Sequence, residues 1–247
     1  MDQRSKIAIL GFGVEGKAVF EYLQKHQYSE LTICDKNPDL KSELPDGISA
    51  RLGEDYLDNL NEFEVIFRSP GISFLNGNVQ TALAKGVEIT SATGFFMDQC
   101  PCPVVGVTGT KGKGTTCTLI YEMLKAAGRE AGVDVFLGGN IGNVPLEFLD
   151  QLKGDSIVVL EMSSFQLQDL KKSPHYAVIL NTTVDHLDYH ADKDEYLQAK
   201  EQLLTHQHKN AVAVLNKDYE YSKYYAPLVK GELSWISTKE KVKDGAY

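Results

Sequence analysis

Short apolar runs alternate with amphipathic segments through the first part of the chain. The runs are rich in β-branched side chains and bounded by glycine or polar residues, which predicts strands at residues 6–10, 31–34, 65–67 and 87–90. Apolar residues at helical spacing predict one helix through Ala18, Val19, Tyr22 and Leu23 and another at residues 79–85. Strands that alternate with helices favour an α/β fold with a parallel sheet, whose ligand site lies beyond the strands' carboxyl ends.

The same alternation resumes after residues 91–103, which we predict to be the junction between two α/β series. An apolar run at 103–107 precedes a segment with Leu119, Ile120, Met123 and Leu124 on one helix face. Further strands are predicted at residues 156–160, 177–180 and 211–215, and a helix is expected from the N-cap Asp192 to about residue 206. For residues 231–247 the pattern predicts no helix or strand that would complete the second series.

A glycine- and lysine-rich segment lies between the 103–107 strand and the helix after it. Glycines let backbone N–H groups turn toward an anion, the helix N-terminus adds positive potential, and a lysine reaches the outer phosphates. The pattern departs from the strict phosphate-loop motif, since Val107 replaces its first glycine and Gly114 follows Lys113. A plain turn would need fewer lysines and threonines, so we expect ATP to be bound by Thr108, Gly109, Thr110, Lys111, Gly112, Lys113, Gly114, Thr115 and Thr116.

A second glycine-rich turn follows the first predicted strand. Gly11, Gly13 and Gly16 form G-x-G-x-x-G between a strand and a helix, and Asp35 ends the next strand. The literal interpretation is a dinucleotide site in which Asp35 binds a ribose. The alternative is a βαβ unit that uses the glycines only for close packing.

Composition narrows the function classes. The net charge of −9 provides no basic field for nucleic acid, and no run reaches the roughly 18 apolar residues of a membrane span. The N-terminus lacks a signal-peptide core, so we expect a cytoplasmic protein. The four cysteines contain no C-x-x-C pair, and Cys100 and Cys102 are interpreted as reduced linker thiols rather than as a metal site.

Polar residues end two strands of the second series. Glu161 follows one strand, and the cluster at 181–186, which contains His186, follows another, on the same edge as Lys113. On the helix after Asp192, Lys200 shares a face with Leu197 and Leu204. A buried lysine loses its proton readily and becomes a nucleophile or a carbon dioxide acceptor. Taken alone, however, the pattern favours a lysine whose ammonium reaches the surface.

Taken together, these motifs resemble the Mur ligase family, in particular the members that add D-glutamate to UDP-N-acetylmuramoyl-L-alanine in peptidoglycan synthesis. The matching segments occur in family order at residues 11–16, 69–71, 108–113, 138–142, 160–167, 181–188 and 196–200.

The resemblance implies a Rossmann-like, UDP-substrate-binding domain at residues 1–93. A P-loop-type α/β ATPase domain would follow at residues 94–247, truncated at its C-terminal end. Contacts to the UDP substrate would come from Gly11, Gly13, Val14, Glu15, Asp35, Lys36, Ser69, Gly71 and Asn140. A third, C-terminal domain with amino-acid and adenine contacts is expected beyond residue 247, so these residues alone should be weakly active or inactive.

The resemblance also implies ATP and two Mg²⁺ ions as cofactors, with D-glutamate as the second substrate and a monomeric enzyme. Catalysis would depend on Lys113, Glu161, His186 and Lys200, with metal contacts from Thr115, Glu161, His186 and Lys200. The lysine matching Lys200 is carbamylated in the family, which turns a costly buried amine into an anionic metal ligand. Gly114 replaces the usual Ser or Thr, so either Thr115 or Thr116 has to supply the metal-binding hydroxyl.

Two other enzyme classes share part of the pattern. A folylpolyglutamate-type ligase has similar ATP chemistry and a comparable G-K-G-S order, but such enzymes lack an N-terminal module of this length. A nicotinamide-dependent oxidoreductase would account for Gly11, Gly13, Gly16 and Asp35, but it would leave Lys113, Glu161 and His186 without a role. A non-catalytic nucleotide-binding subunit is a further alternative.

Overall fold

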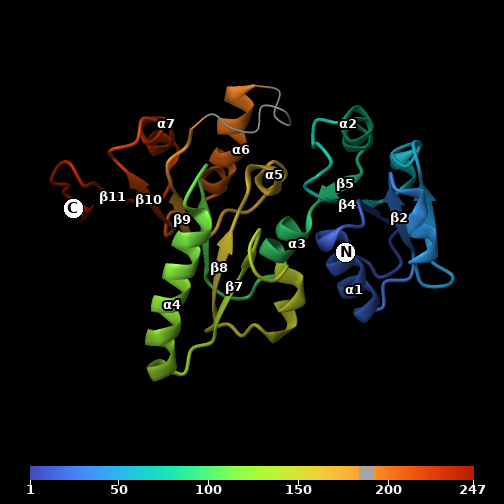
Figure 1. Ribbon diagram of the computed structural model, residues 1–247, viewed down its shortest axis with the longest axis horizontal. Helices are drawn as coiled ribbons and strands as arrows, with labels where there is room; N and C mark the ends of the chain where they lie inside the picture. Colours follow the sequence, from blue (N-terminus) through green and yellow to red (C-terminus); the bar gives the residue numbers. More distant parts are fainter. Residues whose placement is uncertain (184–191) are drawn as a thin grey trace. The chain divides into compact units, whose positions relative to one another are not determined.

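The computed structural model describes residues 1–183 and 192–247 and divides into two compact units, Met1–Phe95 and Phe96–Tyr247 (Figure 1). Each unit is built on one parallel sheet, which confirms the predicted α/β class. The division falls inside one helix, two residues after the predicted domain limit. Among the described residues, no helix combines the length and the apolar content needed to cross a bilayer.

The first unit has a five-stranded sheet in the order β3-β2-β1-β4-β5. Its strands are β1 (Ile7–Leu10), β2 (Leu31–Asp35), β3 (Ser49–Leu52), β4 (Val65–Arg68) and β5 (Glu88–Thr90). Its helical elements are α1 (Val14–Lys25), η1 (Pro38–Ser42), η2 (Leu60–Glu62) and α2 (Gly77–Ala84), and α3 (Ala92–Gln99) crosses into the second unit. Every residue of β1 is fully buried, as expected for a central strand covered on both faces.

The second unit has a seven-stranded sheet in the order β12-β11-β10-β9-β6-β8-β7. Its strands are β6 (Val104–Thr108), β7 (Val135–Gly139), β8 (Ile157–Glu161), β9 (Tyr176–Ile179), β10 (Val212–Asn216), β11 (Glu232–Ile236) and β12 (Gly245–Ala246). Its helical elements are α4 (Lys113–Ala131), η3 (Pro145–Glu147), η4 (Leu149–Gln151), α5 (Ser164–Leu167), α6 (Lys193–Thr205), α7 (Ser222–Tyr225) and η5 (Ala226–Leu228). The carboxyl ends of β6, β8 and β9 therefore meet at one edge of this sheet.

Several elements differ from the sequence-based expectation. β3 and β7 were not predicted, and both are short strands with half-buried side chains. The junction at residues 91–103 contains α3, which begins where the Gly94 N–H donates to the Ser91 hydroxyl at 3.1 Å and which buries Phe96 fully. The tail was expected to lack a closing element, but β11 pairs in parallel with β10 and β12 pairs with β11. Pairing to an existing sheet edge creates strands that local sequence does not indicate.

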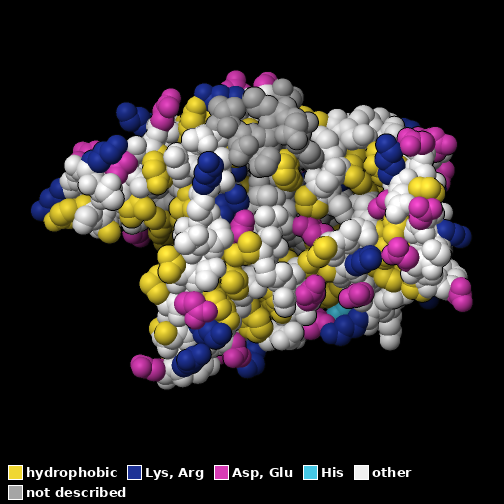
Figure 2. Space-filling view, viewed as in Figure 1, with side chains coloured by type: hydrophobic (Ala, Val, Ile, Leu, Met, Phe, Trp, Pro, Cys, Tyr) yellow, Lys and Arg dark blue, Asp and Glu magenta, His cyan; other side chains and the backbone are white. Residues whose placement is uncertain are grey.

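The apolar face expected on α4 is only partly correct. Ile120 and Leu124 pack with Cys117 against Val107 and Val159 of the sheet. Leu119 and Met123, in contrast, are 59% and 64% exposed, and hydrophobic side chains lie along α4 on the surface in Figure 2. Neighbouring residues of an α-helix point about 100° apart around its axis. The half of the predicted stripe with Ile120 and Leu124 therefore faces the sheet, and the half with Leu119 and Met123 faces solvent.

The two halves of the stripe should respond differently to truncation. Leu124→Ala is expected to lower the free energy of unfolding by about 2 kcal/mol, because it removes packed atoms from the core. Met123→Ala on the exposed side should change it by less than about 0.5 kcal/mol. Urea denaturation of both variants checks this, and equal losses would show that both residues are packed.

Candidate functional site

The loop between β6 and α4 depends on glycine backbone conformations. Gly109 has φ of +149° and Gly112 has φ of +85°, both in the region that disfavours side chains. A Cβ at Gly109 would also lie 2.7 Å from the Leu180 Cβ, so the loop runs closely past the end of β9. The loop then enters α4 at Lys113, with the helix N-terminus directed at the space in front of it.

Thr110 joins this loop by hydrogen bonds to the segment that follows β9. Its N–H donates to the Asn181 carbonyl at 2.8 Å, and its hydroxyl lies 2.9 Å from the Thr183 carbonyl oxygen and 2.8 Å from the Thr183 nitrogen. The same hydroxyl is 3.0 Å from the Tyr196 hydroxyl on α6. The phosphate loop is thereby held by bonds from two other elements, which keeps its amide groups preorganised.

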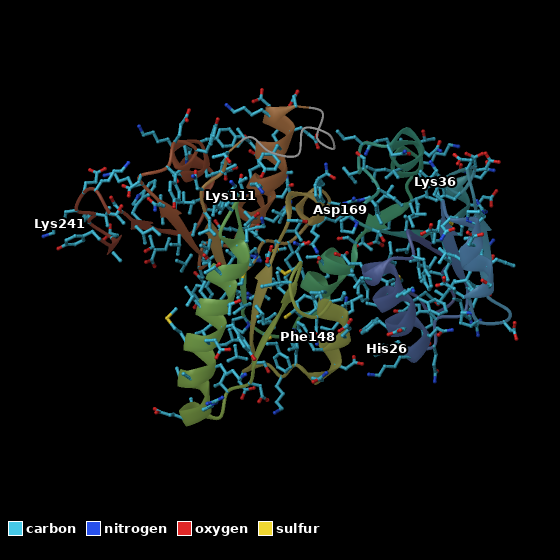
Figure 3. All side chains as sticks on the ribbon, in the orientation of Figure 1. His26, Lys36, Lys111, Phe148, Asp169 and Lys241 are labelled. Atoms are coloured by element: carbon cyan, nitrogen blue, oxygen red, sulfur yellow. The ribbon has the colours of Figure 1, made fainter. Side chains whose placement is uncertain are left out.

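The two lysines of the loop differ in their surroundings. Lys113 is half-buried and its Nζ donates to the Thr110 carbonyl at 3.2 Å, so its ammonium folds back over the loop. Lys111 is exposed at the amino-terminal end of α4 (Figure 3). Thr115 is exposed and Thr116 is half-buried in the first turns of the same helix. Lys113 is thus the lysine whose position suits an anion cradled by the loop.

Glu161 ends β8 beside this helix and is only 4% exposed. Its backbone carbonyl accepts from the Asn140 N–H at 2.9 Å, and its Oε1 accepts from the Asn140 side-chain amide at 3.3 Å. Its Oε2 is buried and has no hydrogen-bond partner among the described residues. A Cβ at Gly114 would lie 3.3 Å from that oxygen, so glycine at this position lets the start of α4 approach the carboxylate closely.

The Cys117 thiol links Lys113 and Glu161 electrostatically. The pKa of Cys117 is raised to about 12, mainly by burial and also by the Glu161 charge, whereas the Lys113 charge acts to lower it. Both charged groups are therefore within electrostatic range of the same buried sulfur atom. The structure brings together the lysine and the carboxylate that the sequence placed at one sheet edge.

A buried carboxylate oxygen without a hydrogen bond is costly unless a cation or donor meets it, and carboxylates are preferred ligands of Mg²⁺. The Glu161 oxygen therefore fits a divalent cation. The described residues contain no cluster of three His, Cys, Asp or Glu side chains. Of the predicted metal ligands, Thr115, Glu161 and Lys200 are described, whereas His186 lies outside the described residues.

Lys200 lies on α6 and is 1% exposed, so the interpretation in which its ammonium reaches the surface is wrong. Its Nζ donates to the Gly109 carbonyl at 3.4 Å and lies 4.4 Å from the centre of the Tyr196 ring. Packing of α6 under the phosphate loop buries the whole side chain. Lys200 therefore contacts the loop from α6, and Lys113 contacts it from α4.

The first unit has its own glycine turn, between β1 and α1. The Gly11 N–H donates to the Cys34 carbonyl at 2.8 Å, and the Ser69 hydroxyl donates to the Gly11 carbonyl at 2.9 Å. Asp35 accepts from the Phe12 N–H at 2.7 Å and from the Asn37 N–H at 2.8 Å. Asp35 therefore shapes the turn directly, a role that the ribose-binding interpretation did not include.

The other predicted substrate contacts of the first unit lie around the same turn, whereas Asn140 belongs to the second unit. Gly13, Val14, Lys36 and Gly71 are exposed, and Glu15 is half-buried. Lys36 makes an ion pair of 3.8 Å with Glu54. Sequence reasoning missed Arg68, which is 1% exposed and donates to the Ile72 carbonyl. An arginine directly after an apolar strand was the available signal, because such a charge is buried only when it is satisfied.

The glycines of this turn allow a matched test. A Cβ at Gly16 would lie 2.0 Å from the Gly11 carbonyl oxygen, whereas a Cβ at Gly13 would meet nothing within 4 Å. Gly16→Ala is therefore expected to lower the free energy of unfolding of the chain by about 3 kcal/mol, through overpacking against backbone. Gly13→Ala should cost less than about 0.5 kcal/mol, near the range of helix-cap substitutions. Thermal or urea unfolding distinguishes them, and similar losses would contradict the packing described here.

A phosphate loop beside a buried carboxylate, on a parallel sheet, defines a nucleotide-binding α/β protein. Two family models agree with this class: the Mur ligase middle domain matches residues 107–244, and the N-terminal domain of MurD-like Mur ligases matches residues 5–91. The first match alone covers more than half of the chain. The chain belongs to the Mur ligase family.

Curated relatives carry the name UDP-N-acetylmuramoylalanine–D-glutamate ligase. The protein from Acetivibrio thermocellus is 38% identical over 250 residues, covering 99% of this chain and 53% of the relative. The protein from Clostridium acetobutylicum is 37% identical over 254 residues, and the alignment covers 99% of this chain and 54% of the relative. The chain thus spans about half the length of these relatives.

Solved structures share the fold. The UDP-N-acetylmuramate:L-alanyl-γ-D-glutamyl-meso-diaminopimelate ligase from Neisseria meningitidis aligns with a TM-score of 0.59 at 20% identity, covering 94% of this chain and 78% of that one. The MurF ligase from Thermotoga maritima, solved with ADP, aligns with a TM-score of 0.50 at 19% identity. The alignment covers 96% of this chain and 48% of that one. At these identities the likeness concerns the fold.

Proposed function

We propose that the protein containing this chain is an ATP-dependent ligase that joins D-glutamate to UDP-N-acetylmuramoyl-L-alanine in peptidoglycan synthesis. The observation that carries the proposal is the buried oxygen of Glu161, which lies beside the phosphate loop and has no hydrogen-bond partner among the described residues. Relatives at 37–38% identity have the corresponding name, which supports the choice of substrates.

ATP would bind with its phosphates on the loop of residues 108–116. The N–H groups at the start of α4 and the Lys113 ammonium would offset the phosphate charge, while the bonds of Thr110 keep the loop in place. Mg²⁺ would contact Glu161 and a threonine hydroxyl of α4, with His186 and Lys200 completing a second site. Bound there, the ions would neutralise charge on the phosphate oxygens.

The UDP part of the substrate would bind at the glycine turn of the first unit. The exposed Gly13, Val14 and Gly71 leave backbone accessible there, and Lys36 provides a cation for the diphosphate. Gly11, Glu15, Asp35 and Ser69 would shape or contact the same site. Asn140 is expected near the reacting carboxyl group, because its side chain is bound to Glu161.

The reaction would proceed by transfer of the γ-phosphoryl group of ATP to the terminal carboxylate of the substrate. The resulting acyl phosphate is attacked by the amine of D-glutamate, and the tetrahedral intermediate releases phosphate to leave the amide. Lys113 stabilises the charge that spreads over the transferring oxygens, so the protein contributes mainly positioning and electrostatics.

Lys200 would act as a carbamate in this enzyme. Its nearly complete burial makes an ammonium costly, and conversion to an anion would supply a metal ligand below the loop. We also propose a cytoplasmic monomer, as the resemblance to the Mur ligases implies. Native mass spectrometry of the full-length protein tests the oligomeric state, and intact mass tests the carbamate.

The alternatives from the sequence are less well supported. The match of residues 5–91 to the MurD-like N-terminal domain accounts for the module that a folylpolyglutamate-type ligase lacks. A nicotinamide-dependent oxidoreductase would leave Lys113 and Glu161 unused, and both carboxylate oxygens of Asp35 already accept N–H donors.

The substrate assignment is tested by phosphate release from the full-length protein with ATP, UDP-N-acetylmuramoyl-L-alanine and a panel of amino acids. We expect release to depend on D-glutamate and on Mg²⁺, with L-glutamate and other amino acids supporting at most about one hundredth of that rate, since a wrong isomer leaves buried polar groups unpaired. Equal rates with several amino acids would overturn the assignment.

A further inference from the structure

Two cysteines lie side by side in the short segment between α3 and β6. The Sγ atoms of Cys100 and Cys102 are 3.6 Å apart, and the Cys100 thiol donates to the Cys102 carbonyl at 3.5 Å. Cys102 is 3% exposed, whereas Cys100 is half-exposed. Cys34 and Cys117 are fully buried. Cys100 is therefore the more exposed residue of the pair, and its sulfur is in contact with that of the buried Cys102.

The backbone around the pair holds the two sulfurs together. The Cys100 N–H donates to the Phe96 carbonyl at 2.8 Å, which ends α3, and the Pro103 carbonyl accepts from the Val158 N–H at 3.0 Å, which starts the pairing of β6. Pro101 between the cysteines has a restricted φ. Because both flanks are fixed, little chain entropy is lost when the two side chains react with each other.

The two thiols differ in the chemistry that their positions allow. Burial, followed by the neighbouring Cys100, raises the pKa of Cys102 to about 12, so that this thiol is a poor first nucleophile toward a reagent in solution. Thiol–disulfide exchange needs a thiolate that can reach its partner, and Cys100 is the more exposed residue of this pair. Cys100 is thus suited to attack, and Cys102 to resolve the product from within.

We propose that Cys100 and Cys102 form a redox-active dithiol that low-molecular-weight disulfides oxidise to an intramolecular disulfide. The Cys100 thiolate attacks one sulfur of the small disulfide, which forms a mixed disulfide and releases one thiolate. Cys102 then loses its proton to solvent and attacks the Cys100 sulfur, which releases the second thiolate. The protein loses two electrons and two protons, and the small disulfide is reduced to two thiols.

This assignment differs from both interpretations of the sequence motif. A metal site would need further ligands, and the part of the chain that the structure describes contains no group of three His, Cys, Asp or Glu side chains. The interpretation as linker thiols assigned the pair no chemistry, whereas their sulfur atoms lie 3.6 Å apart. Proximity, a fixed backbone and unequal exposure together favour exchange chemistry.

The proposal is tested on the folded chain with oxidised glutathione. After quenching, free thiols are counted under denaturing conditions with a maleimide mass tag, and the peptide containing both cysteines is mapped. The wild type should lose two of its four thiols without keeping a glutathione adduct. Cys102→Ser should instead keep one adduct, on Cys100, because the resolving thiol is gone. Cys117→Ser, as the matched control, should still lose two thiols.

Cys100→Ser should react at least about 10-fold more slowly than the wild type, because the remaining sulfur is shielded. If Cys102→Ser does not fold, Cys102→Ala serves in its place, since it adds no buried hydroxyl. A wild type that retains four thiols while Cys102→Ser takes up glutathione would overturn the proposal. A wild type that holds a stable adduct on Cys100, or that pairs other cysteines, would do the same.

Discussion

Lys113→Ala in the full-length protein should reduce ATP-dependent phosphate release by about 10³-fold, because it removes the ammonium that would stabilise the transferring phosphoryl group. The loop itself should persist, since Thr110 is held by the segment after β9 and by Tyr196 rather than by the lysine alone. The unfolding midpoint should therefore change little while the rate falls.

Lys125→Ala is the matched control for this substitution. Lys125 lies further along α4, with its ammonium 4.9 Å from the centre of the Tyr121 ring, and it is distant from the loop in sequence. It should retain the wild-type rate. Wild-type turnover in Lys113→Ala would refute the role proposed for this lysine, and an equal loss in both variants would indicate a general effect of charge on α4.

Glu161→Gln should lower phosphate release by at least about 100-fold and remove most of the response to Mg²⁺, because a neutral amide is a poor substitute for a carboxylate ligand. The replacement has nearly the same shape, and its carbonyl oxygen is able to accept from Asn140 as Oε1 does. The defect should therefore concern the cation and not the fold.

Thermal unfolding separates a loss of Mg²⁺ binding from a loss of fold stability in Glu161→Gln. Without Mg²⁺, Glu161→Gln should be at least as stable as the wild type, because it eliminates a buried charge whose Oε2 has no hydrogen-bond partner among the described residues. Added Mg²⁺ and ATP should raise the unfolding midpoint of the wild type more than that of the variant. Glu147→Gln, at an exposed carboxylate of η3, should behave like the wild type. A variant that responds to Mg²⁺ as strongly as the wild type would remove Glu161 from the metal site.

Local pattern was sufficient for much of the fold. The strands at the centres of both sheets are short apolar runs between glycine turns, and α6 begins where Asp192 accepts from the Glu195 N–H at 2.9 Å, as its capping signal predicts. Elements at sheet edges were missed because their side chains are half-buried and their order comes from pairing with a neighbour. β11, for example, forms because β10 offers an unpaired edge.

Some features of the candidate site were also predictable from the sequence, and others were not. Residue types and their order along the chain were enough to predict the phosphate loop, Glu161 and Lys200 as site residues, since these predictions depend on short motifs and strand ends. Sequence could not say that Leu119 and Met123 face solvent, because helical periodicity gives a stripe but not the direction of the sheet. It also could not give the burial of Lys200, which depends on α6 packing beneath a loop about ninety residues earlier in the chain.

By itself, the sequence determined the class of fold, the two glycine turns and the family, because these follow from local backbone requirements and from the order of motifs. Only the tertiary structure decided that Gly114 lies against the buried Glu161 oxygen, that Asp35 shapes the turn of the first unit, and that the Cys100 and Cys102 sulfurs are in contact. Each of these depends on distances between atoms that the fold brings together, and such distances are set by the packing of whole elements and not by any single segment.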